Sequence, residues 1–562
     1  MRHLSRIKKS NKETGVLPNR SALFLTFLNR KLSIFRIKSI ELVGLFFIFL
    51  PSLTETKDLC YTIDCVHSIS EEIETTLFLI HSPKTRFRKD DDYHMLTKEA
   101  ILKRPELQQI VQKYRHNIER SEQLALQYQE NYQINPSFYE QYDVKCGLRD
   151  ADGRGVLAGL TGISKVQATK LENGVQVPAE GELFYRGYSI SDLVNGFIQQ
   201  NRFGFEEIIY LLLTGELPKA DELKSFHELL ADYQNLPAHF KSSVIMRMPS
   251  DNIMNGMEKC VLALHSTDPK PDDISIPNVM RQCLELIARF PSLAVYNYQM
   301  TQYFHKGSSM VLRKPKPDKT IAENLLTMMR PDGKYTQLEA RLLDLALVLH
   351  AEHGGGNNST FTMHVVTSSG TDTYSAISAS LGSLKGPKHG GANLKVMEMF
   401  QDLKAHVTDW NNRDAIRSYL TGLLNREGFD HSGLIYGLGH AVYTVSDPRA
   451  RILKKFAEML SNEKQMHDEF QLYQTVEEIA TELLLERRKT NKGVCANVDF
   501  YSGFVYEMLG IPMELYTPIF AIARIAGWSA HRIEELTNSN KIIRPAYRPV
   551  GLERTYVPLG ER

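Results

Sequence analysis

Apolar and polar positions alternate with the period of an α-helix along most of this chain. From Met95 to Tyr132 apolar residues recur at helical spacing while the other faces stay polar. Later helical patterns, separated by Gly or Pro, cover residues 191–200, 204–218, 339–356 and 475–489. The stretch RLLDLALVLH, residues 341–350, is apolar on nearly every face, which predicts a helix that is buried on all sides.

A single segment, near 165–186, departs from this helical pattern. Short runs on either side of Asn173 and Gly174 predict a small β-hairpin, because an Asn-Gly pair favours a tight turn between two strands. Strands and helices do not alternate elsewhere, and no internal repeat is visible. The pattern therefore predicts a mainly α fold for residues 95–562.

Residues 1–94 differ from the rest and are expected to be an atypical N-terminal extension. The first 38 residues carry ten Lys or Arg and a single acid, Glu13. An apolar run then begins at Leu42 and is broken by Pro51, which is shorter than the roughly 20 residues that a membrane span needs. The extension is irrelevant to the fold, with Met95 as the true start, or it is a targeting segment, although no small-residue cleavage site follows the apolar run, or it has a structural role. A membrane anchor is not expected.

Charge and cysteine content narrow the class of protein further. The 562 residues include 67 Lys and Arg and 66 Asp and Glu, a net charge of +1. This balance argues against a nucleic-acid binder, which needs a basic surplus. The six cysteines include no CxxC pair, so neither a zinc ribbon nor a disulfide framework is indicated, and we expect a reducing, cytoplasmic location.

The stretch HAEHGGGNNST, residues 350–360, places two histidines three positions apart before three glycines. His353 is either a helix C-capping residue with Gly354 as the cap, or a catalytic side chain held at a helix end. A zinc site is disfavoured because the HExxH order is absent. An esterase oxyanion loop is disfavoured because no GxSxG elbow follows.

Three further segments carry isolated polar groups. His440 stands between glycine-rich residues in YGLGHAVYTVSDPRARIL, a stretch that a turn and a helix start would explain only in part. Asp499 stands alone among apolar neighbours, where it either caps a helix or acts as a weakly solvated base. Arg524 is the only charge of an apolar run and requires an anionic partner, whereas Arg544 is less distinctive.

Taken in order, these motifs resemble the citrate synthase family over about residues 150–550. GLGHAVYTVSDPR is similar to the signature stretch of the family, and HAEHGGGNNS resembles its first-histidine segment. GPKHGGAN (386–393), NVDFYSG, ARIAGWSAH, IIRP and LFYRGYSISDL resemble further family segments. Seven such stretches in one order make coincidence an inadequate explanation.

This resemblance implies three catalytic residues. His353 would donate a hydrogen bond to the thioester oxygen of acetyl-CoA while Asp499 removes a methyl proton. His440 would hydrogen-bond and polarise the ketone of oxaloacetate, which the enol attacks; the citryl-CoA formed is then hydrolysed. The chemistry fits these residue types, because a carboxylate base acts on a weak carbon acid only if the developing enolate oxygen is stabilised.

The resemblance also implies binding residues. Arg449, Arg524 and, from a neighbouring subunit, Arg544 would hold the carboxylates of oxaloacetate, since the guanidinium fork binds a carboxylate in a bidentate manner. His305 is a looser candidate for the same substrate. Lys492 and Gly439 are candidates for contacts with CoA, because Thr444 stands where many family members carry a basic residue. No metal site is expected.

The expected fold is a two-domain, all-helical citrate synthase-like fold with the hairpin as its small β element. After the extension 1–94, residues 95–354 would begin a large helical domain, 355–510 would form a small one, and 511–562 would return to the large domain. The family is usually a homodimer with shared active sites. Residues 371–384 are rich in Ala, Ser and Gly, which suits an interface and an internal contact equally.

The implied activity is that of a citrate synthase, an acyltransferase of the tricarboxylic acid cycle. Its partners would be acetyl-CoA and oxaloacetate, with no cofactor other than the CoA thioester and with neither nucleic acid nor a membrane span. A 2-methylcitrate synthase using propionyl-CoA is the alternative, because one methylene is worth only about 1–3 kcal/mol in an apolar pocket. A non-catalytic homologue acting as a binding protein is disfavoured, since the catalytic residues and arginines are all present.

Overall fold

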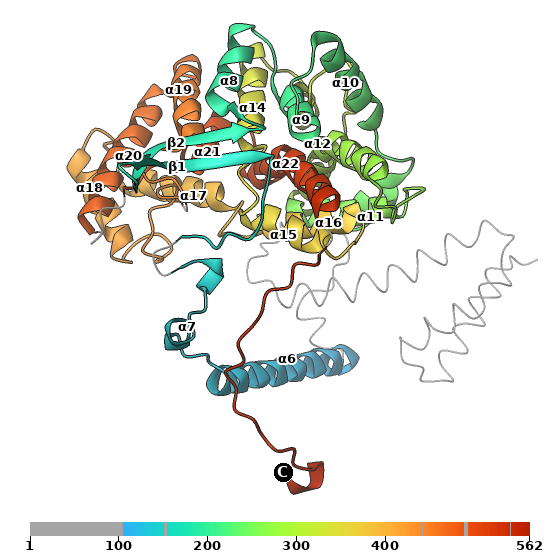
Figure 1. Ribbon diagram of the computed structural model, residues 1–562, viewed down its shortest axis with the longest axis vertical. Helices are drawn as coiled ribbons and strands as arrows, with labels where there is room; N and C mark the ends of the chain where they lie inside the picture. The colour runs from blue at the N-terminus through green and yellow to red at the C-terminus, as the bar shows by residue number, and fades with distance from the viewer. Residues whose placement is uncertain (1–104, 151–153, 441, 488–492, 540) are drawn as a thin grey trace, which may run out of the picture. The chain divides into compact units, whose positions relative to one another are not determined.

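The computed structural model describes residues 105–150, 154–440, 442–487, 493–539 and 541–562 (Figure 1). The extension 1–94 and the CoA candidate Lys492 lie outside these residues. The chain divides into two compact units, residues 1–138 and 139–562. In the first unit, helix α6 (Pro105–Asn131) confirms the helix predicted after Met95 for the part that is described.

The second unit is mainly helical, as predicted. A short helix, α7 (Ser137–Gln141), crosses the boundary between the units. The remaining helices are α8 (Ile190–Gln199), α9 (Phe205–Thr214), α10 (Ala220–Tyr233), α11 (Ile253–His265), α12 (Ile276–Lys306), α13 (Ile321–Met329), α14 (Gln337–His350), α15 (Asn358–Thr367), α16 (Thr373–Lys385), α17 (Ala392–His406), α18 (Arg413–Leu424), α19 (Pro448–Glu463), α20 (His467–Arg487), α21 (Val498–Met508) and α22 (Tyr516–Asn538).

The predicted hairpin is present as part of a three-stranded antiparallel sheet. Strand β1 (Ser164–Glu172) pairs with β2 (Val175–Tyr185), which pairs with the two-residue strand β3 (Tyr188–Ser189). Asn173 and Gly174 join β1 to β2 with φ angles of 51° and 81°. Positive φ at both central residues is the geometry of the tight turn that an Asn-Gly pair favours.

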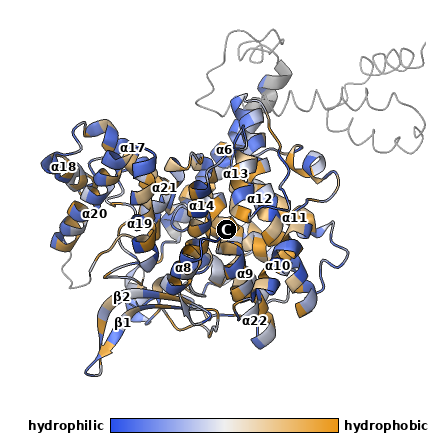
Figure 2. Ribbon diagram, turned by 90° about the horizontal axis from the view of Figure 1, so that it is seen from above, coloured by the Kyte–Doolittle hydropathy of each residue, from blue (hydrophilic) through white to orange (hydrophobic). Residues whose placement is uncertain are grey.

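Two helices form the centre of the core. Residues 342–350 of α14 are all buried, which confirms the prediction of a helix enclosed on every side. Residues 516–532 of α22 are buried as well, and this helix packs on α9, α12, α14, α15 and α16. The strongly hydrophobic colouring of α12 in Figure 2 marks the same core. No helix of the described part of the chain is long and apolar enough to cross a bilayer.

The helices of the second unit pack in two groups. Helices α17–α21 pack on one another and lie to the left in Figure 1, whereas α9–α12, α16 and α22 lie to the right. Helices α14 and α8 contact α19, so the two groups meet there. Helices α15 and α16 pack on α11 or α22, although they fall within the predicted small domain 355–510. The division into two domains therefore stays a prediction.

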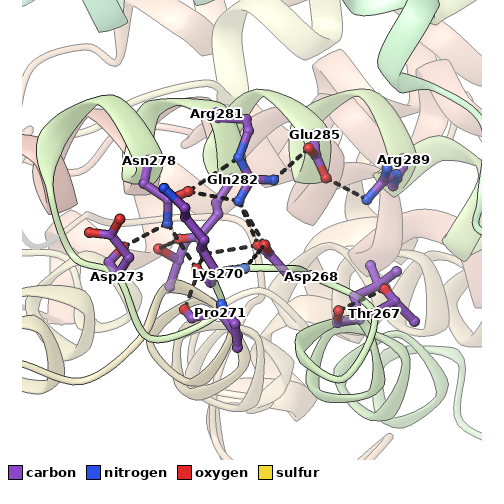
Figure 3. A network of polar contacts seen from close by, with 12 residues as sticks. Thr267, Asp268, Lys270, Pro271, Asp273, Asn278, Arg281, Gln282, Glu285 and Arg289 are labelled. Carbon is purple, nitrogen blue, oxygen red and sulfur yellow. Dashed lines mark hydrogen bonds and ion pairs between the residues drawn. The ribbon is translucent and has the colours of Figure 1, made fainter.

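A buried carboxylate ties the loop after α11 to helices α12 and α16. Asp268, whose side chain is 1% exposed, accepts hydrogen bonds from Arg281 at 2.7 Å and Gln282 at 2.9 Å (Figure 3). It also accepts one from the Tyr374 hydroxyl at 2.7 Å. Burial alone would raise the pKa of Asp268, but hydrogen bonds from the Lys270 N–H and from these side chains lower it to about 2. The loop is thus fixed by a carboxylate that is charged at neutral pH.

Candidate active site

The segment that carries His353 is a loop between α14 and α15. Helix α14 ends at His350, whose carbonyl accepts a hydrogen bond of 2.8 Å from Nε of Arg524. The hydroxyl of Tyr185, on β2, donates to the carbonyls of Val348 and Glu352. Donors from β2 and α22 therefore satisfy the end of the helix, and the C-cap is Ala351. The interpretation of His353 as a C-capping residue with Gly354 as the cap is wrong.

Gly354 has a different task, which is to turn the chain after His353. Its φ of +85° is one that side chains rarely adopt, and an added Cβ would lie 3.3 Å from Val166 on β1. Its N–H donates to the carboxylate of Glu352 at 2.5 Å. The loop is therefore closed against the hairpin, and His353 is held at a defined position.

His353 and His440 lie next to each other. Their ring centroids are 5.1 Å apart, and Tyr443 packs on both rings. Nε2 of His353 lies 3.3 Å from the Tyr443 hydroxyl. Burial, and then the positive charge of Arg449, hold the pKa of His353 well below its usual value. His353 is therefore neutral at physiological pH, as a hydrogen-bond donor to a carbonyl oxygen should be.

His440 has a defined tautomer. Its Nδ1 accepts hydrogen bonds from the backbone N–H groups of Val442 and Tyr443 at 3.0 and 3.1 Å. Burial, followed by the charge of Arg449, lowers the pKa of His440 to about 4. A neutral imidazole that accepts at Nδ1 must carry its hydrogen on Nε2. His440 thus offers an N–H to a ligand, which suits the polarisation of a ketone.

Two buried guanidinium groups accompany the histidines. Arg449, 3% exposed near the start of α19, makes a bidentate ion pair with Asp447, with Nη2–Oδ2 at 2.7 Å. Arg524, 1% exposed, makes no ion pair with any described carboxylate and stacks on Phe520. Burial lowers the pKa of Arg524 to about 10, against the favourable charge of Glu352. Both arginines are cationic, and Arg524 has the charge to bind an anion.

Asp499 is the second residue of α21, but it does not cap that helix. The cap is Asn497, whose side-chain oxygen accepts from the Asp499 N–H at 3.0 Å, so the capping interpretation of Asp499 is wrong. Oδ1 of Asp499 is buried without a hydrogen-bond partner among the described residues. Burial raises the pKa of Asp499 to about 6, against the opposing charge of Arg449. This carboxylate is therefore a stronger base than one in water.

Backbone contacts join the segments of His440 and Asp499. The Gly439 N–H donates to the Cys495 carbonyl at 2.8 Å, and the Asn497 N–H donates to the Gly437 carbonyl at 2.9 Å. The side chain of Asn497 donates to the Gly439 carbonyl at 3.0 Å. Gly439, a predicted CoA-binding residue, thus makes structural contacts here, and its contact with CoA stays a prediction.

A third histidine, His389, was not singled out by the sequence. It lies in GPKHGGAN, which was recognised only as a loop. Its Nε2 lies 3.3 Å from the backbone nitrogen of Ser359 and 2.9 Å from the Ser359 hydroxyl oxygen, so Ser359 holds this edge of the ring. Burial, and then the charge of Arg524, lower its pKa to about 4. Its ring packs on Phe520, the same ring on which Arg524 stacks. A histidine followed by two glycines was the signal available in the sequence.

Other predicted residues do not join this cluster in the described part of the single chain. His305 is exposed at the last turn of α12, and no contact links it to His353, His440 or the arginines. Arg544 is exposed in the extended segment after α22, and a role in a neighbouring subunit is not tested by one chain. His353, His440, Asp499, Arg449 and Arg524 do share one buried electrostatic environment.

The comparisons with known proteins agree with this arrangement. The sequence profile of the family described as citrate synthase, C-terminal domain, matches residues 148–546. A citrate synthase from Deinococcus radiodurans is 37% identical over 362 residues, which are 64% of this chain and 88% of that protein. A 2-methylcitrate synthase (2-methylcitrate synthase 1) from Corynebacterium glutamicum is 32% identical over 416 residues, 73% of this chain and 97% of that protein.

A solved structure supports the same conclusion. The ternary complex of citrate synthase from Thermoplasma acidophilum with carboxymethyl coenzyme A and oxaloacetate superposes with a TM-score of 0.61 at 29% identity. The match covers 72% of this chain and 97% of that one, and confirms the predicted mainly helical fold. The profile match across residues 148–546, most of the chain, identifies this protein as a member of the citrate synthase family.

Proposed function

We propose that this acyltransferase condenses acetyl-CoA with oxaloacetate and hydrolyses the resulting citryl-CoA to citrate and CoA. The observation that carries the proposal is the half-buried carboxylate of Asp499, whose Oδ1 is buried without a partner among the described residues and whose pKa is raised by burial against the charges of Arg449 and Arg524. A base in this environment is suited to remove a proton from the weakly acidic methyl group of a thioester. The C–H electron pair then forms the enolate, and its carbon attacks the ketone.

Oxaloacetate carries two carboxylates and a ketone, and the pocket offers matching groups. Arg449 and Arg524 supply two buried positive charges, and Nε2–H of His440 supplies a donor for the ketone oxygen. As the ketone becomes an alkoxide, this donor stabilises the developing charge. Arg544 from a neighbouring subunit of a homodimer would contribute a third positive charge, as the resemblance implies.

The hydrogen bond to the thioester oxygen has two candidate donors. The resemblance assigned this role to His353, but His353 lies against His440 and near Arg449, on the side proposed for oxaloacetate. His389 lies outside this histidine pair, and Ser359 holds its ring through contacts with Nε2. The geometry therefore favours His389 as the donor to the thioester oxygen, with His353 joining His440 at oxaloacetate.

A 2-methylcitrate synthase is the second candidate, favoured by the relatives of that name at 32–34% identity. The two reactions differ by one methylene of the acyl group, which is worth about 1–3 kcal/mol in an apolar pocket. The catalytic residues would be the same in both reactions. The choice therefore depends on residues around the acyl group rather than on the cluster described above.

The test is release of CoA thiol by the purified chain with oxaloacetate and either acetyl-CoA or propionyl-CoA, with the product identified by mass spectrometry. We expect oxaloacetate-dependent release, formation of citrate and a higher kcat/KM for acetyl-CoA. Glu463→Gln, which changes an exposed carboxylate on α19, serves as the control and should keep full activity. A higher kcat/KM for propionyl-CoA would establish the second candidate, and no release with either thioester would contradict both.

A further inference from the structure

One face of α22 is directed at the loop that carries His353. Arg524, Gly527 and His531 are spaced at i, i+3 and i+7, so they lie on the same side of this helix. All three contact residues 350–352, as described below. Only Arg524 was expected to have a role in substrate binding, and the mechanism above uses neither Gly527 nor His531.

Gly527 allows the loop to lie directly on the helix backbone. A Cβ at this position would come within 2.5 Å of the Ala351 carbonyl oxygen and would also collide with the carboxylate of Glu352. Because both obstacles belong to the same short loop, any side chain at position 527 would push that loop away from α22. One turn earlier, Nε of Arg524 holds the His350 carbonyl at 2.8 Å.

His531 completes this face by binding Glu352, the residue directly before His353. Its Nε2 lies 3.0 Å from Oε1 of Glu352, and both side chains are fully buried. The same carboxylate oxygen accepts from the Ser164 hydroxyl at 2.8 Å and from the Gly354 N–H. Burial opposes the charge of Glu352, but His531, Arg524 and Ser164 hold its pKa at about 2. An ionised carboxylate therefore anchors the loop to α22 and to β1.

The ring of His531 is itself oriented by a second pair. Its Nδ1 lies 3.1 Å from Nε2 of His364 on α15, and Nδ1 of His364 lies 2.8 Å from Oε2 of Glu535. Two imidazole groups in series thus connect the carboxylate of Glu352 to that of Glu535. A carboxylate or imidazole behind a functional histidine fixes the direction of its N–H, as it does behind metal-bound histidines. Here the chain directs Nε2–H of His531 at Glu352.

We propose that His531 and Glu352 are positioning residues that fix the His353 loop relative to Arg524, and so set the affinity of the pocket for oxaloacetate. The inference rests on the proposed function only in naming this dicarboxylate as the ligand. His353 comes from the loop after α14 and Arg524 from α22, and the contacts of the His350 carbonyl and the Glu352 carboxylate with α22 hold this loop in place on that helix. Neither positioning residue touches the substrate.

Two substitutions at the same position test the proposal. In His531→Asn the shorter amide does not reach Glu352, whereas in His531→Gln an amide N–H can replace Nε2–H. We expect the Asn variant to raise the KM and Kd for oxaloacetate at least about 10-fold, since misplacement by about 1 Å can cost up to about 100-fold. The Gln variant should restore most of the affinity. The KM for the acyl-CoA should stay within about twofold of wild type, because that substrate is held elsewhere.

Gly527→Ala and Arg532→Gln complete the experiment. Gly527→Ala should reproduce the loss of oxaloacetate affinity by moving the loop. Arg532 is fully buried beside His531 but donates to Thr367, Thr371 and Thr373, so Arg532→Gln controls for a general loss of stability. This control should have a lower Tm and unchanged substrate constants.

Calorimetric binding of oxaloacetate separates the two proposals. Wild type that binds oxaloacetate but releases no CoA would contradict the proposed function, and the Kd values of the variants would still test the positioning role. Unchanged oxaloacetate Kd in both His531→Asn and Gly527→Ala would overturn the positioning role, as would an equal effect in Arg532→Gln. Wild type that does not bind oxaloacetate would overturn both.

Discussion

At the scale of single residues, the site consists of charged and polar groups kept from water without full pairing. Asp499 is the clearest case, because its Oδ1 is buried without a partner among the described residues. The N-terminus of α21 is capped by Asn497 and not by Asp499. The sequence identified Asp499 and Arg524 because each is a lone charge in an apolar stretch. It did not identify His389, whose ring is held by contacts with Ser359, 30 residues away.

Because burial disfavours the charged form of Asp499, removing this charge should increase the stability of the folded protein. A carboxyl whose pKa is raised to about 6 in the folded state, against about 4 in the unfolded chain, destabilises the fold when it is ionised. Asp499→Asn should therefore have a higher Tm than wild type at pH 8. This difference should shrink as the pH falls through 6 and vanish below 4. Thermal unfolding of both proteins across this pH range tests the prediction. A higher Tm for wild type than for Asp499→Asn at pH 8 would contradict it.

The roles of His389 and His353 can be separated by kinetics. His389→Gln removes the imidazole proposed to donate to the thioester oxygen, so we expect kcat to fall at least about 100-fold with little change in the Kd for oxaloacetate. His353→Gln should instead weaken oxaloacetate binding. Steady-state kinetics and calorimetry on both variants provide the comparison. If His353→Gln lowered kcat and His389→Gln weakened oxaloacetate binding, His353 would be the donor to the thioester oxygen, as the resemblance first implied.

At the scale of elements, local signals decided what the sequence could predict. The Asn-Gly turn was sufficient to place the hairpin, and the unbroken apolar run was sufficient to place α14 in the core. The end of α14 was less predictable. The three glycines suggested that the helix ends at Gly354, but it ends at His350, where Tyr185 and Arg524 donate hydrogen bonds to its last carbonyls. These donors come from elements distant in the sequence, and no local pattern reports them.

The loop after α11 offers a prediction at the same scale. Asp268→Ala would leave Arg281 and Gln282 (Figure 3), and also Tyr374, without their shared acceptor, and breaking such a buried pair costs about 3 kcal/mol. The pKa of Asp268 is lowered to about 2, so its contribution is present above about pH 4 and is lost as the pH falls toward 2. Denaturant unfolding should show a large difference between variant and wild type at pH 7 and a small one at pH 2. A constant difference would contradict this assignment.

At the scale of the whole molecule, the resemblance to the family predicted features that the structure of a single chain does not test. The helical architecture and the family are confirmed, whereas the boundary at 355 is not tested, and α15 and α16 pack on the helices of the other group. Domain boundaries depend on which surfaces separate during motion, and this property has no signature in local sequence patterns. Arg544 is likewise exposed in a single chain.

Sharing of the active site between subunits predicts complementation. If Arg544 serves the neighbouring subunit, a heterodimer of Arg544→Ala and Asp499→Asn contains one intact site, although each homodimer has none. Equal co-expression should then restore about a quarter of wild-type activity, because half of the dimers are mixed and each has one working site. Activity no higher than that of the separate variants would show that Arg544 acts within its own chain or not at all.

The most direct test of the account measures catalysis and oxaloacetate binding in Asp499→Asn. We predict that the rate of oxaloacetate-dependent CoA release falls at least about 100-fold in this variant, as expected for loss of a general base. The Kd for oxaloacetate should stay within a few-fold of wild type, since His440, Arg449 and Arg524 are unchanged. Retained activity, or a loss of oxaloacetate binding that matches the loss of rate, would contradict the assignment of Asp499 as the base.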